Sequence, residues 1–489
     1  MNLPRTPKDV CVPIIAQKTK ADFLNNARNL DDLAKLAQEA TPQVDVTRSW
    51  LNKLNLLSPS QARIRQMTFS VVDQALSVGG IFLINIALAR TQTQQSYGIF
   101  ALTYSVFIFL VGLHNAAILE AYTIYGSGRY HRQFPAYERL LWRTNVLGSL
   151  ALSVTLVVAW RALAWMAPDK ASYTLLGMAL SCGIFLMASF IRRTFYMRRR
   201  PDLAARVSVV FFVTCALLVW LSIRVGILSG FYAFLIAAIS WCVAGLFVLH
   251  ELPGNERTEN FADFEPAYWS EHWKYSRWVF VTALIFQFTM QGYYWITAGI
   301  LSVREVADLR AMYNLVTPMD QVFGAMNLLI LPMFSFRFAS RRMAGLIPLW
   351  KKYCLSWLLI SASFAVVLNV AGRSLMHKLY AGKFDDISSL IGVLALLPIV
   401  MGTGNTINAA LKALEKPQAV FCAYVMSGAT TFLVGVPLVI RFGLRGAVYG
   451  MLASAAVYSA ALAVALLTSF RAGRHNILST KVAKEDSVF

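Results

Sequence analysis

The side chains that could do chemistry in this sequence stand inside long apolar stretches, where they recur on helical stripes. In residues 67–90 the stripe consists of Ser70, Gln74, Ser77 and Asn85, with Asp73 beside it. In residues 276–301 it consists of Gln287, Gln291 and Tyr294, and in residues 307–334 of Arg310, Asn314, Thr317 and Gln321, with Asp320 adjacent. Polar groups are costly in a bilayer, so they usually face the interior of a helix bundle or a watery cavity. The stripes therefore predict the walls of a polar cleft.

The same argument extends to single polar residues in other apolar stretches, namely His114, Glu120, Arg192, Asn405, Asn408 and Lys412. Each has an ordinary structural alternative. Asp73 and Asp320 could pair across helices, and His114 could be a hydrogen-bonding group between helices. Arg310 could simply extend toward the membrane surface. The stripes as a set are stronger evidence for a cleft than any one member.

The sequence contains none of the residue patterns that catalysis requires. We find no closely spaced carboxylates in a polar loop, no Ser–His–Asp context, no cluster of metal ligands and no glycine-rich phosphate loop. The six cysteines form no CxxC motif, and most lie in apolar stretches as small core residues. We expect a protein that is not an enzyme and that needs neither a metal nor a cofactor.

Composition identifies the elements that position these residues. The chain has 489 residues, of which 57% are hydrophobic and only 14% charged, and its mean hydropathy is +0.54. Soluble chains carry about 25% charged residues, and a helix that crosses a bilayer needs roughly 20 apolar residues. The sequence therefore predicts an all-α polytopic membrane protein with about 12 transmembrane helices. The predicted spans are 67–90, 96–122, 140–166, 172–195, 203–226, 229–250, 276–301, 307–334, 348–372, 386–412, 417–440 and 445–470.

Basic residues set the predicted topology. The formal net charge is +20, and Lys and Arg crowd alternate loop edges, as in Arg198–Arg200 and Lys351–Lys352. The positive-inside rule places these loops and both termini in the cytoplasm, so no nucleic-acid partner is needed to explain the charge. The predicted parts are a cytoplasmic tail with short amphipathic helices (1–64), an N-lobe (65–250), a cytoplasmic connector (251–275), a C-lobe (276–470) and a cytoplasmic C-terminal tail (471–489).

The two lobes repeat each other. Leu141-Trp142-Arg143 opens the third span and Leu349-Trp350-Lys351 opens the ninth. Arg200-Pro201 precedes the fifth span, and Lys416-Pro417 precedes the eleventh at nearly the same offset. Because each copy contains six spans, both begin on the same side, which makes the repeats parallel. The pattern predicts two six-helix bundles around a central cavity.

The stretch Val72–Leu102, VDQALSVGGIFLINIALARTQTQQSYGIFAL, resembles polysaccharide-export flippases. These are the Wzx-like translocases for O-antigen and exopolysaccharide, within the multidrug/oligosaccharidyl-lipid/polysaccharide exporter superfamily. The shared features are an Asp-Gln near the inner end of the first span, an Ala-Arg at its outer end, and a Tyr-Gly-x-Phe-Ala that opens the second. Further matching features are the Arg-rich Ile191–Pro201, His272–Tyr275, Leu309–Ala311 and Leu331-Pro332. The long N-terminal tail departs from the family pattern.

The resemblance implies a MATE-like fold and a specific cargo. The substrate would be an undecaprenyl-diphosphate-linked oligosaccharide, moved across a bacterial inner membrane. The diphosphate would bind Arg310, Lys412 and Arg192. The glycan path would be lined by Asp73, Gln74, Asn85, Gln287, Gln291, Asn314 and Asn408. Coupling to protons or sodium would fall to Asp320 or Glu120.

Other readings stay open alongside this one. A cation-coupled MATE-type small-molecule exporter would favour acidic groups in its cavity. A polytopic polymerase, ligase or glycosyltransferase would need a large outer loop, and the sequence has none. A noncatalytic subunit of a polysaccharide synthesis complex would leave a role for the N-terminal tail. The expected partners of a flippase are the lipid-linked oligosaccharide, membrane lipids, and the polymerase and export machinery.

Overall fold

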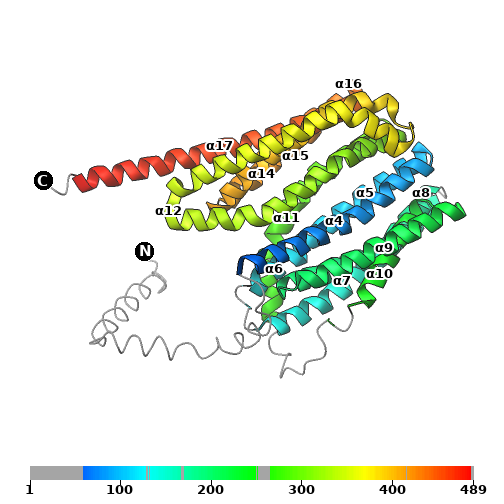
Figure 1. Ribbon diagram of the computed structural model, residues 1–489, viewed down its shortest axis with the longest axis horizontal. Coiled ribbons are helices and arrows are strands. Elements are labelled where there is room, and N and C mark those ends of the chain that lie inside the picture. The colour runs from blue at the N-terminus through cyan, green and yellow to red at the C-terminus, as the bar shows by residue number, and fades with distance from the viewer. Residues whose placement is uncertain are drawn as a thin grey trace, which may run out of the picture. The chain divides into compact units, whose positions relative to one another are not determined.

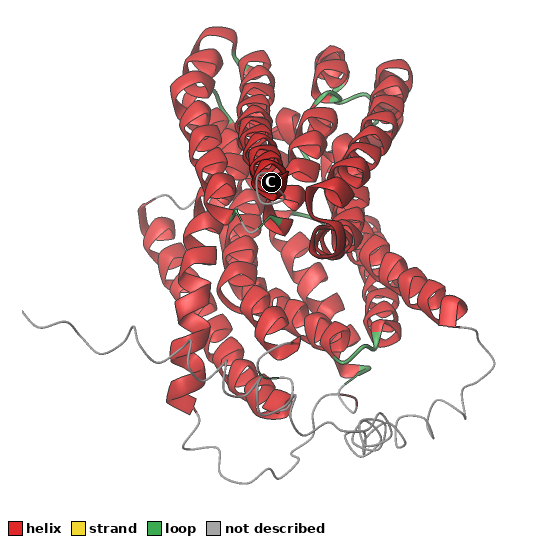
Figure 2. Ribbon diagram, turned by 90° about the vertical axis from the view of Figure 1, so that its left-hand side faces the viewer, coloured by secondary structure: helices red, strands yellow, loops and turns green. Residues whose placement is uncertain are grey.

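The computed structural model describes residues 59–485, apart from 128–129, 131–132, 167–169, 249–250, 252–264 and 415. The amphipathic helices predicted for the N-terminal tail lie outside the described residues. Figure 2 shows that the described part consists of helices and short connections, without a strand. The described residues from Thr68 onward belong to one compact unit.

We call the helices α4 to α10 the N-lobe (Figure 1). Its helices are α4 (Pro59–Thr91), α5 (Gln94–His114), the π-helix η1 (Asn115–Leu119), α6 (Glu120–Ser127), α7 (Phe134–Met166), α8 (Lys170–Met197), α9 (Pro201–Val225) and α10 (Gly230–Leu246). Capping interactions and glycine conformation fix the ends of several helices. The Thr93 side chain caps α5 by accepting from the Ser96 backbone N–H, and Gly226 ends α9 at a φ of 78°.

We call the helices α11 to α17 the C-lobe (Figure 1). Its elements are α11 (Glu265–Ile300), α12 (Val303–Tyr380), the 3-10 helix η4 (Asp385–Leu390), α13 (Ile391–Leu394), α14 (Leu397–Ala413), α15 (Pro417–Thr430), the π-helix η5 (Thr431–Gly435), α16 (Val436–Phe442) and α17 (Leu444–Glu485). Within the described residues each predicted span is mostly helical, although the tenth begins with the 3-10 helix η4 and is interrupted at Ala395 and Leu396. α11 begins at Glu265, inside the stretch assigned to the connector.

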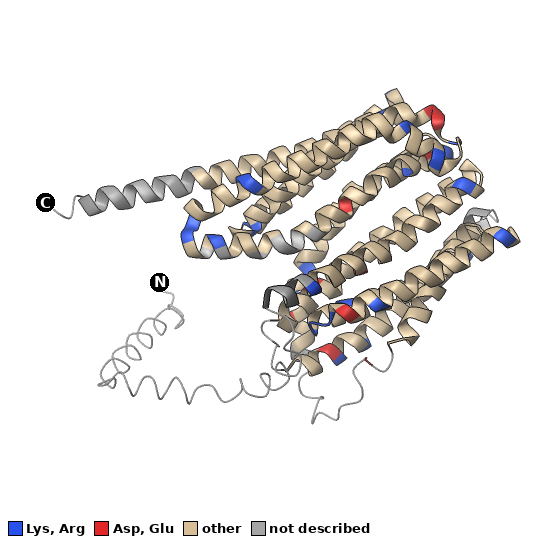
Figure 3. Ribbon diagram, viewed as in Figure 1, with Lys and Arg blue, Asp and Glu red and all other residues tan. Residues whose placement is uncertain are grey.

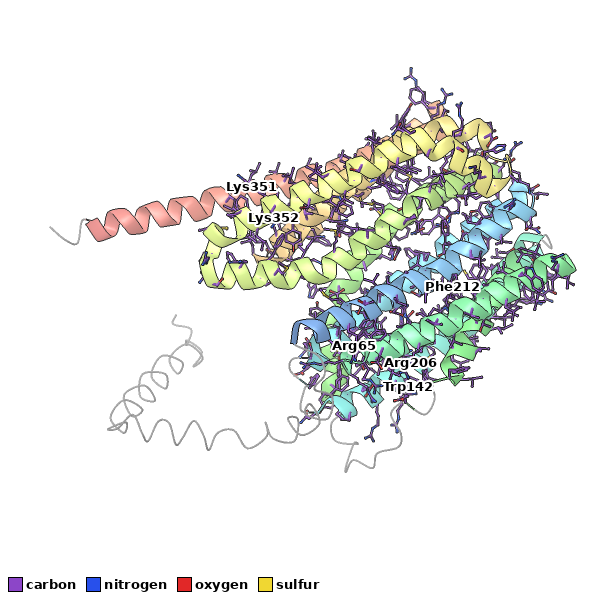
Figure 4. The ribbon with its side chains drawn as sticks, in the orientation of Figure 1. Arg65, Trp142, Arg206, Phe212, Lys351 and Lys352 are labelled. Atoms are coloured by element: carbon purple, nitrogen blue, oxygen red, sulfur yellow. The ribbon has the colours of Figure 1, made fainter. Side chains whose placement is uncertain are left out.

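The eighth and ninth spans belong to one helical stretch, α12, which reverses direction at Arg342. That residue has φ 48° and ψ −141°, and it is the non-helical point inside α12. Figure 1 shows the two parts of α12 lying side by side as a hairpin. Lys351 and Lys352 follow the reversal, at the start of the returning part (Figure 4). The reversal replaces the loop that the sequence predicted between residues 334 and 348.

The internal repeat is visible in backbone geometry. Arg200 precedes Pro201 at the start of α9 with φ −112° and ψ 61°. Lys416 precedes Pro417 at the start of α15 with φ −111° and ψ 59°. A proline at the first helical position supplies a pre-set φ without the loss of a needed hydrogen bond, which explains its use in both copies. The same turn therefore opens the fifth span of each lobe.

Membrane insertion is supported by length and by what the surface exposes. Among the described residues, nine helical stretches are long and apolar enough to cross a membrane, and α10 is apolar but shorter. On α7, Leu147, Leu150, Val154 and Val158 are exposed at helical spacing, as lipid-facing residues would be. Charged residues lie mostly toward helix ends (Figure 3). This is the pattern of a multi-pass membrane protein.

Two helices predicted as spans, α11 and the first part of α12, are not among those nine stretches. They are long enough, but they carry the polar stripes with Gln287, Gln291, Arg310 and Asp320. Polar residues lower hydropathy and are tolerated in a span that faces protein or water rather than lipid. These two helices are therefore the ones expected to face a cavity.

Close packing of α4 against α9 positions the first polar stripe. A Cβ at Gly80 would lie 2.5 Å from Cε1 of the Phe211 ring, and one at Gly79 would lie 3.4 Å from Cε2 of Phe212. The two glycines thus let α9 approach α4 along the side that Phe212 marks in Figure 4. Phe211 in turn stacks on Trp241 of α10, with ring centroids 4.0 Å apart. The cluster fixes α4, α9 and α10 as one rigid wall.

Candidate functional site

A cavity of about 1000 Å³ lies between the two lobes, and its walls come from α4, α5, α8 and α10 on one side and α11, α12, α14, α15 and α17 on the other. All but two of the predicted site residues line it: Gln74, Asn85, Arg192, Gln287, Gln291, Arg310, Asn314, Asp320, Asn408 and Lys412. The structure thus brings together side chains that are far apart in the sequence. Their individual roles stay predictions.

Asp73 and Glu120 do not line the cavity. Asp73 is completely buried behind the wall. Glu120 begins α6 and accepts a hydrogen bond from the Tyr275 hydroxyl of α11 at 3.3 Å. Asp73 was predicted beside the polar stripe and on the glycan path, but the structure turns it away from the cavity that its neighbour Gln74 lines.

One end of the cavity is closed by direct contact between the lobes, and we call this the closed end (residues 90–97 and 380–384). The Lys383 ammonium donates to the carbonyl oxygens of Arg90 and Gln92 at 2.7 and 2.9 Å. Gln94 donates back to the Lys383 carbonyl at 2.9 Å. A Cβ at Gly98 would overlap the Val303 carbonyl, so α5 and the start of α12 touch backbone to backbone.

The closed end continues inward as a buried polar layer. The Asn314 amide donates to the Tyr97 hydroxyl at 3.0 Å and to that of Tyr380 at 3.4 Å. Tyr380 donates to the Ala311 carbonyl at 3.0 Å. All the side chains in this layer are buried, so breaking it leaves polar groups without water. Asn314 therefore lies at the floor of the cavity and joins α12 to α5.

Arg310 lies one turn of α12 before Asn314 and bridges the lobes. Its Nε donates to the Asn85 side-chain oxygen of α4 at 3.2 Å. Its guanidinium lies 4.5 Å from the centroid of the Tyr104 ring of α5. In the described part of the chain, no ion pair joins Arg310 to a carboxylate. A guanidinium with neutral partners and access to a cavity is suited to binding an anion.

Asp320 is the single carboxylate among the described residues that line the cavity. It accepts a hydrogen bond from the Tyr313 hydroxyl at 3.0 Å, two turns back along α12. Gln321, its neighbour, accepts at 3.2 Å from Gln74 across the lobes. Both glutamines are accessible, so this end of the cavity is held by fewer buried contacts than the closed end.

Arg192 faces the cavity from α8 and is paired with Asp73. Its Nε and Nη2 donate to the two carboxylate oxygens at 3.0 and 2.7 Å. The same Nη2 donates to Ser77 at 3.0 Å, and the guanidinium carbon lies 5.6 Å from the Trp241 ring centroid. The pair confirms none of the roles predicted for Asp73 and Arg192, but it explains why both occur in apolar helices.

Asn408 and Lys412 line the C-lobe wall one helical turn apart on α14. The Asn408 amide donates to the hydroxyls of Tyr424 and Tyr458 at 3.3 and 3.0 Å. The two tyrosine rings are stacked, with centroids 4.9 Å apart. The Asn408 side-chain oxygen is buried without a hydrogen-bond partner in the described part, and Lys412 is exposed. This wall therefore offers an aromatic face, a free acceptor and a cation.

The first turns of α11 pack against the N-lobe rather than the cavity. His272 Nε2 lies 2.9 Å from the Ala117 carbonyl in η1, and its Nδ1 lies 2.8 Å from the Tyr137 hydroxyl. A carbonyl only accepts, so Nε2 carries the proton and Nδ1 accepts from Tyr137. Burial lowers the pKa of His272, although the Ala117 hydrogen bond partly offsets this. The imidazole is neutral in this docked position.

Sequence reasoning missed the aromatic lining of the cavity, chiefly Tyr104, Tyr313, Tyr424, Trp241 and Trp357. Such residues in apolar spans resemble ordinary core residues. The sequence offered one indication that tyrosines reach the cavity. Tyr313 directly precedes Asn314 of the polar stripe, and Tyr424 follows the Lys416-Pro417 turn of the repeat. Which of them reach the cavity depends on helix rotation, and the sequence does not fix that.

No protein-family model matches the sequence, and no curated protein does so either. Solved structures do match. An inward-facing MATE multidrug transporter of the MOP superfamily has a TM-score of 0.67 at 12% identity, covering 84% of this chain and 99% of its own. A MOP superfamily transporter from Pyrococcus furiosus has 0.62 at 11%, covering 87% and 97%. A Vibrio cholerae MATE transporter has 0.59 at 14%, covering 84% and 97%.

The chain has the MATE fold. The match extends over almost the full length of each of these transporters and most of this chain, so both lobes and the cavity between them belong to it. At these identities the likeness concerns the fold alone, and function has to be argued from the cavity. The Pyrococcus furiosus protein is described as having a binding pocket of reverse polarity that suggests a different function. Pocket polarity is therefore the property to compare.

Proposed function

We propose that this protein is a flippase that moves undecaprenyl-diphosphate-linked oligosaccharide across the inner membrane of a bacterium by alternating access. One observation carries the proposal. The charged residues that line the cavity, within the described part, are Arg192, Arg310, Lys412 and one carboxylate, Asp320. Arg192 is paired with Asp73 behind the wall, so two further cations, Arg310 and Lys412, stand against one carboxylate. A cavity with this balance attracts an anionic head group and repels a cationic drug.

The rest of the lining supports a glycan next to that head group. Amides and hydroxyls supply the donors and acceptors that sugars need, for example Gln287, Asn405 and Ser454. Aromatic rings such as Tyr104 and Tyr424 offer flat apolar faces for sugar rings. The cavity volume of about 1000 Å³ suits a short oligosaccharide rather than a small ion.

The closed end supports alternating access as the mechanism. The lobes meet there through Lys383, Asn314 and Gly98. Basic loops predict that the opposite end faces the cytoplasm, so the present state would receive cargo from the inner leaflet. The lipid chain would stay in the bilayer while the diphosphate binds Arg310 and Lys412. Separation of the lobes at the closed end would then release the cargo outside.

Two other functions remain as outcomes of the test. A cation-coupled MATE-type small-molecule exporter would bind cationic compounds and would not transport a lipid diphosphate. A noncatalytic subunit of a polysaccharide synthesis complex would bind partner proteins and move nothing by itself. A transporter is proposed rather than an enzyme, because the solved structures that share the fold are transporters.

Transport by purified protein in liposomes is the direct test, with a fluorescent undecaprenyl-diphosphate-linked oligosaccharide as probe. Arg310→Gln should lower the transport rate about tenfold, since it removes a charge-assisted contact worth roughly 1.5–3 kcal/mol. Arg224→Gln is the matched control, because Arg224 also lies over an aromatic ring, at 5.5 Å from the Trp220 centroid, but does not line the cavity. Equal rates in both variants would remove Arg310 from the substrate path.

A further inference from the structure

The three cations of the cavity differ in how their charge is compensated. Arg192 forms a two-point ion pair with Asp73, whose side chain is fully buried. Arg310 contacts neutral groups, Asn85, Tyr104 and Tyr294, and the Asp320 carboxylate acts on its charge without forming an ion pair with it. Lys412 is exposed to the cavity, and no ion pair involves it in the described part of the chain. The charge available to an anion is therefore unequal on the two walls.

Asp73 is saturated as an acceptor. Besides the two bonds from Arg192, it accepts from the Tyr196 hydroxyl at 2.6 Å and from the Ser208 hydroxyl at 2.5 Å. The donors come from α8 and α9, so three helices hold this carboxylate in place. No part of it reaches the cavity, and its whole charge is directed at Arg192 and these hydroxyls.

The same contacts fix the direction of Arg192. Two of its nitrogens point back toward Asp73 and Ser77, and its planar group lies over Trp241. What faces the cavity is the remaining edge of a neutralised guanidinium beside an aromatic ring. A neutral donor next to a ring is suited to a sugar hydroxyl, whereas a diphosphate needs uncompensated charge.

We propose that Asp73 is a positioning residue that withholds the charge of Arg192 from the substrate. The diphosphate then binds the C-lobe wall, through Arg310 and Lys412, and the Asp73–Arg192 pair faces the sugar. This rests on the proposed flippase function and refines it. The anion is thereby confined to the C-lobe wall, and the glycan gains a contact on the N-lobe wall beside the amides and hydroxyls of the C-lobe.

A double-substitution cycle on the full-length protein in nanodiscs tests this, with undecaprenyl diphosphate, which carries no sugar, as the binding probe. Asp73→Asn should release the Arg192 charge and tighten binding about fivefold. Adding Arg192→Gln should return the affinity to within about twofold of the unsubstituted protein, because the charge released is then gone. A role of Asp73 confined to folding would not produce a gain in affinity.

Glu138→Gln is the matched control. Glu138 is also buried and paired with an arginine, Arg198, at 2.7 Å, but neither residue lines the cavity. Its substitution should leave probe affinity unchanged. If Glu138→Gln tightens binding as much as Asp73→Asn does, the gain reflects net charge alone and the inference is wrong.

Two results would overturn the inference. The first is unchanged or weaker binding by Asp73→Asn. The second is a tenfold loss in the Asp73→Asn/Arg192→Gln protein, which would make Arg192 itself an anion ligand. If Asp73→Asn alone does not fold, the double variant, which leaves no buried charge unpaired, decides the matter. Failure of the unsubstituted protein to bind the lipid would contradict the proposed function instead, and inorganic pyrophosphate would then replace it as probe of the Asp73→Asn gain.

Discussion

Lys383 offers a quantitative test of the closed end. Its ammonium donates to the carbonyls of Arg90 and Gln92 at 2.7 and 2.9 Å, and both acceptors belong to the other lobe. Lys383→Met keeps the alkyl chain and removes both hydrogen bonds. Because Lys383 is exposed, each bond is discounted to about 0.5 kcal/mol, or about 1 kcal/mol together. That corresponds to about a fivefold shift toward the state in which this end is open.

The assay measures the distance between two spin labels, attached at Gln95→Cys and Ser389→Cys. Both positions are exposed, and they lie on opposite lobes. The native cysteines are replaced by serine so that only these two positions are labelled. Lys383→Met should raise the population with the longer distance about fivefold. Lys378→Met is the control, since Lys378 is exposed in the last turn of α12, just before the turn that holds Lys383, and has no hydrogen bond in the described part of the chain. The reasoning is refuted if the two variants give the same distance distribution.

Two further substitutions test other contacts between the lobes. Gly98→Ala should prevent the lobes from meeting at the closed end, because its Cβ would overlap the Val303 carbonyl. The transport rate should fall at least tenfold, which corresponds to the free-energy cost of about 1.4 kcal/mol expected for a disturbed core contact. The control Gly148→Ala, where a Cβ meets nothing within 4 Å, should transport at the normal rate. Burial lowers the pKa of His272, so the unfolded chain gains a proton first as the pH falls below about 6.5 and the folded protein loses stability. Between pH 7.5 and 5.5 the melting temperature should therefore drop, and His272→Gln should reduce the drop; an equal drop in both proteins would show that His272 is not its source.

The sequence predicted where the helices lie along the chain and which helix faces line a cavity. Long apolar stretches and period-3.6 stripes depend on local spacing, which is why the sequence alone assigns residues such as Gln74, Gln287 and Asn314 to a cavity. The internal repeat could be recognised from the sequence for a similar reason. Arg200-Pro201 and Lys416-Pro417 adopt the same turn because proline fixes φ locally in both lobes.

Pairings across the fold could not be predicted in the same way. Asp73 and Arg192 are separated by 119 positions, and nothing local in either helix indicates that they meet. The Lys383 contacts depend on a turn reaching the backbone of the other lobe. A turn between the eighth and ninth spans was predicted, but its placement at the single residue Arg342 was not, since a positive φ at a non-glycine residue is set by its surroundings and not by its type.

Leaflet-specific labelling of lipid-linked oligosaccharide in cells tests the central claim most directly. In cells that lack this protein, the account predicts that complete repeat units accumulate on the cytoplasmic leaflet and that surface polysaccharide is lost. Expression of the unsubstituted protein should restore the outer-leaflet pool, and expression of Arg310→Gln should not. A normal leaflet distribution with mature polysaccharide in the cells that lack the protein would contradict the account.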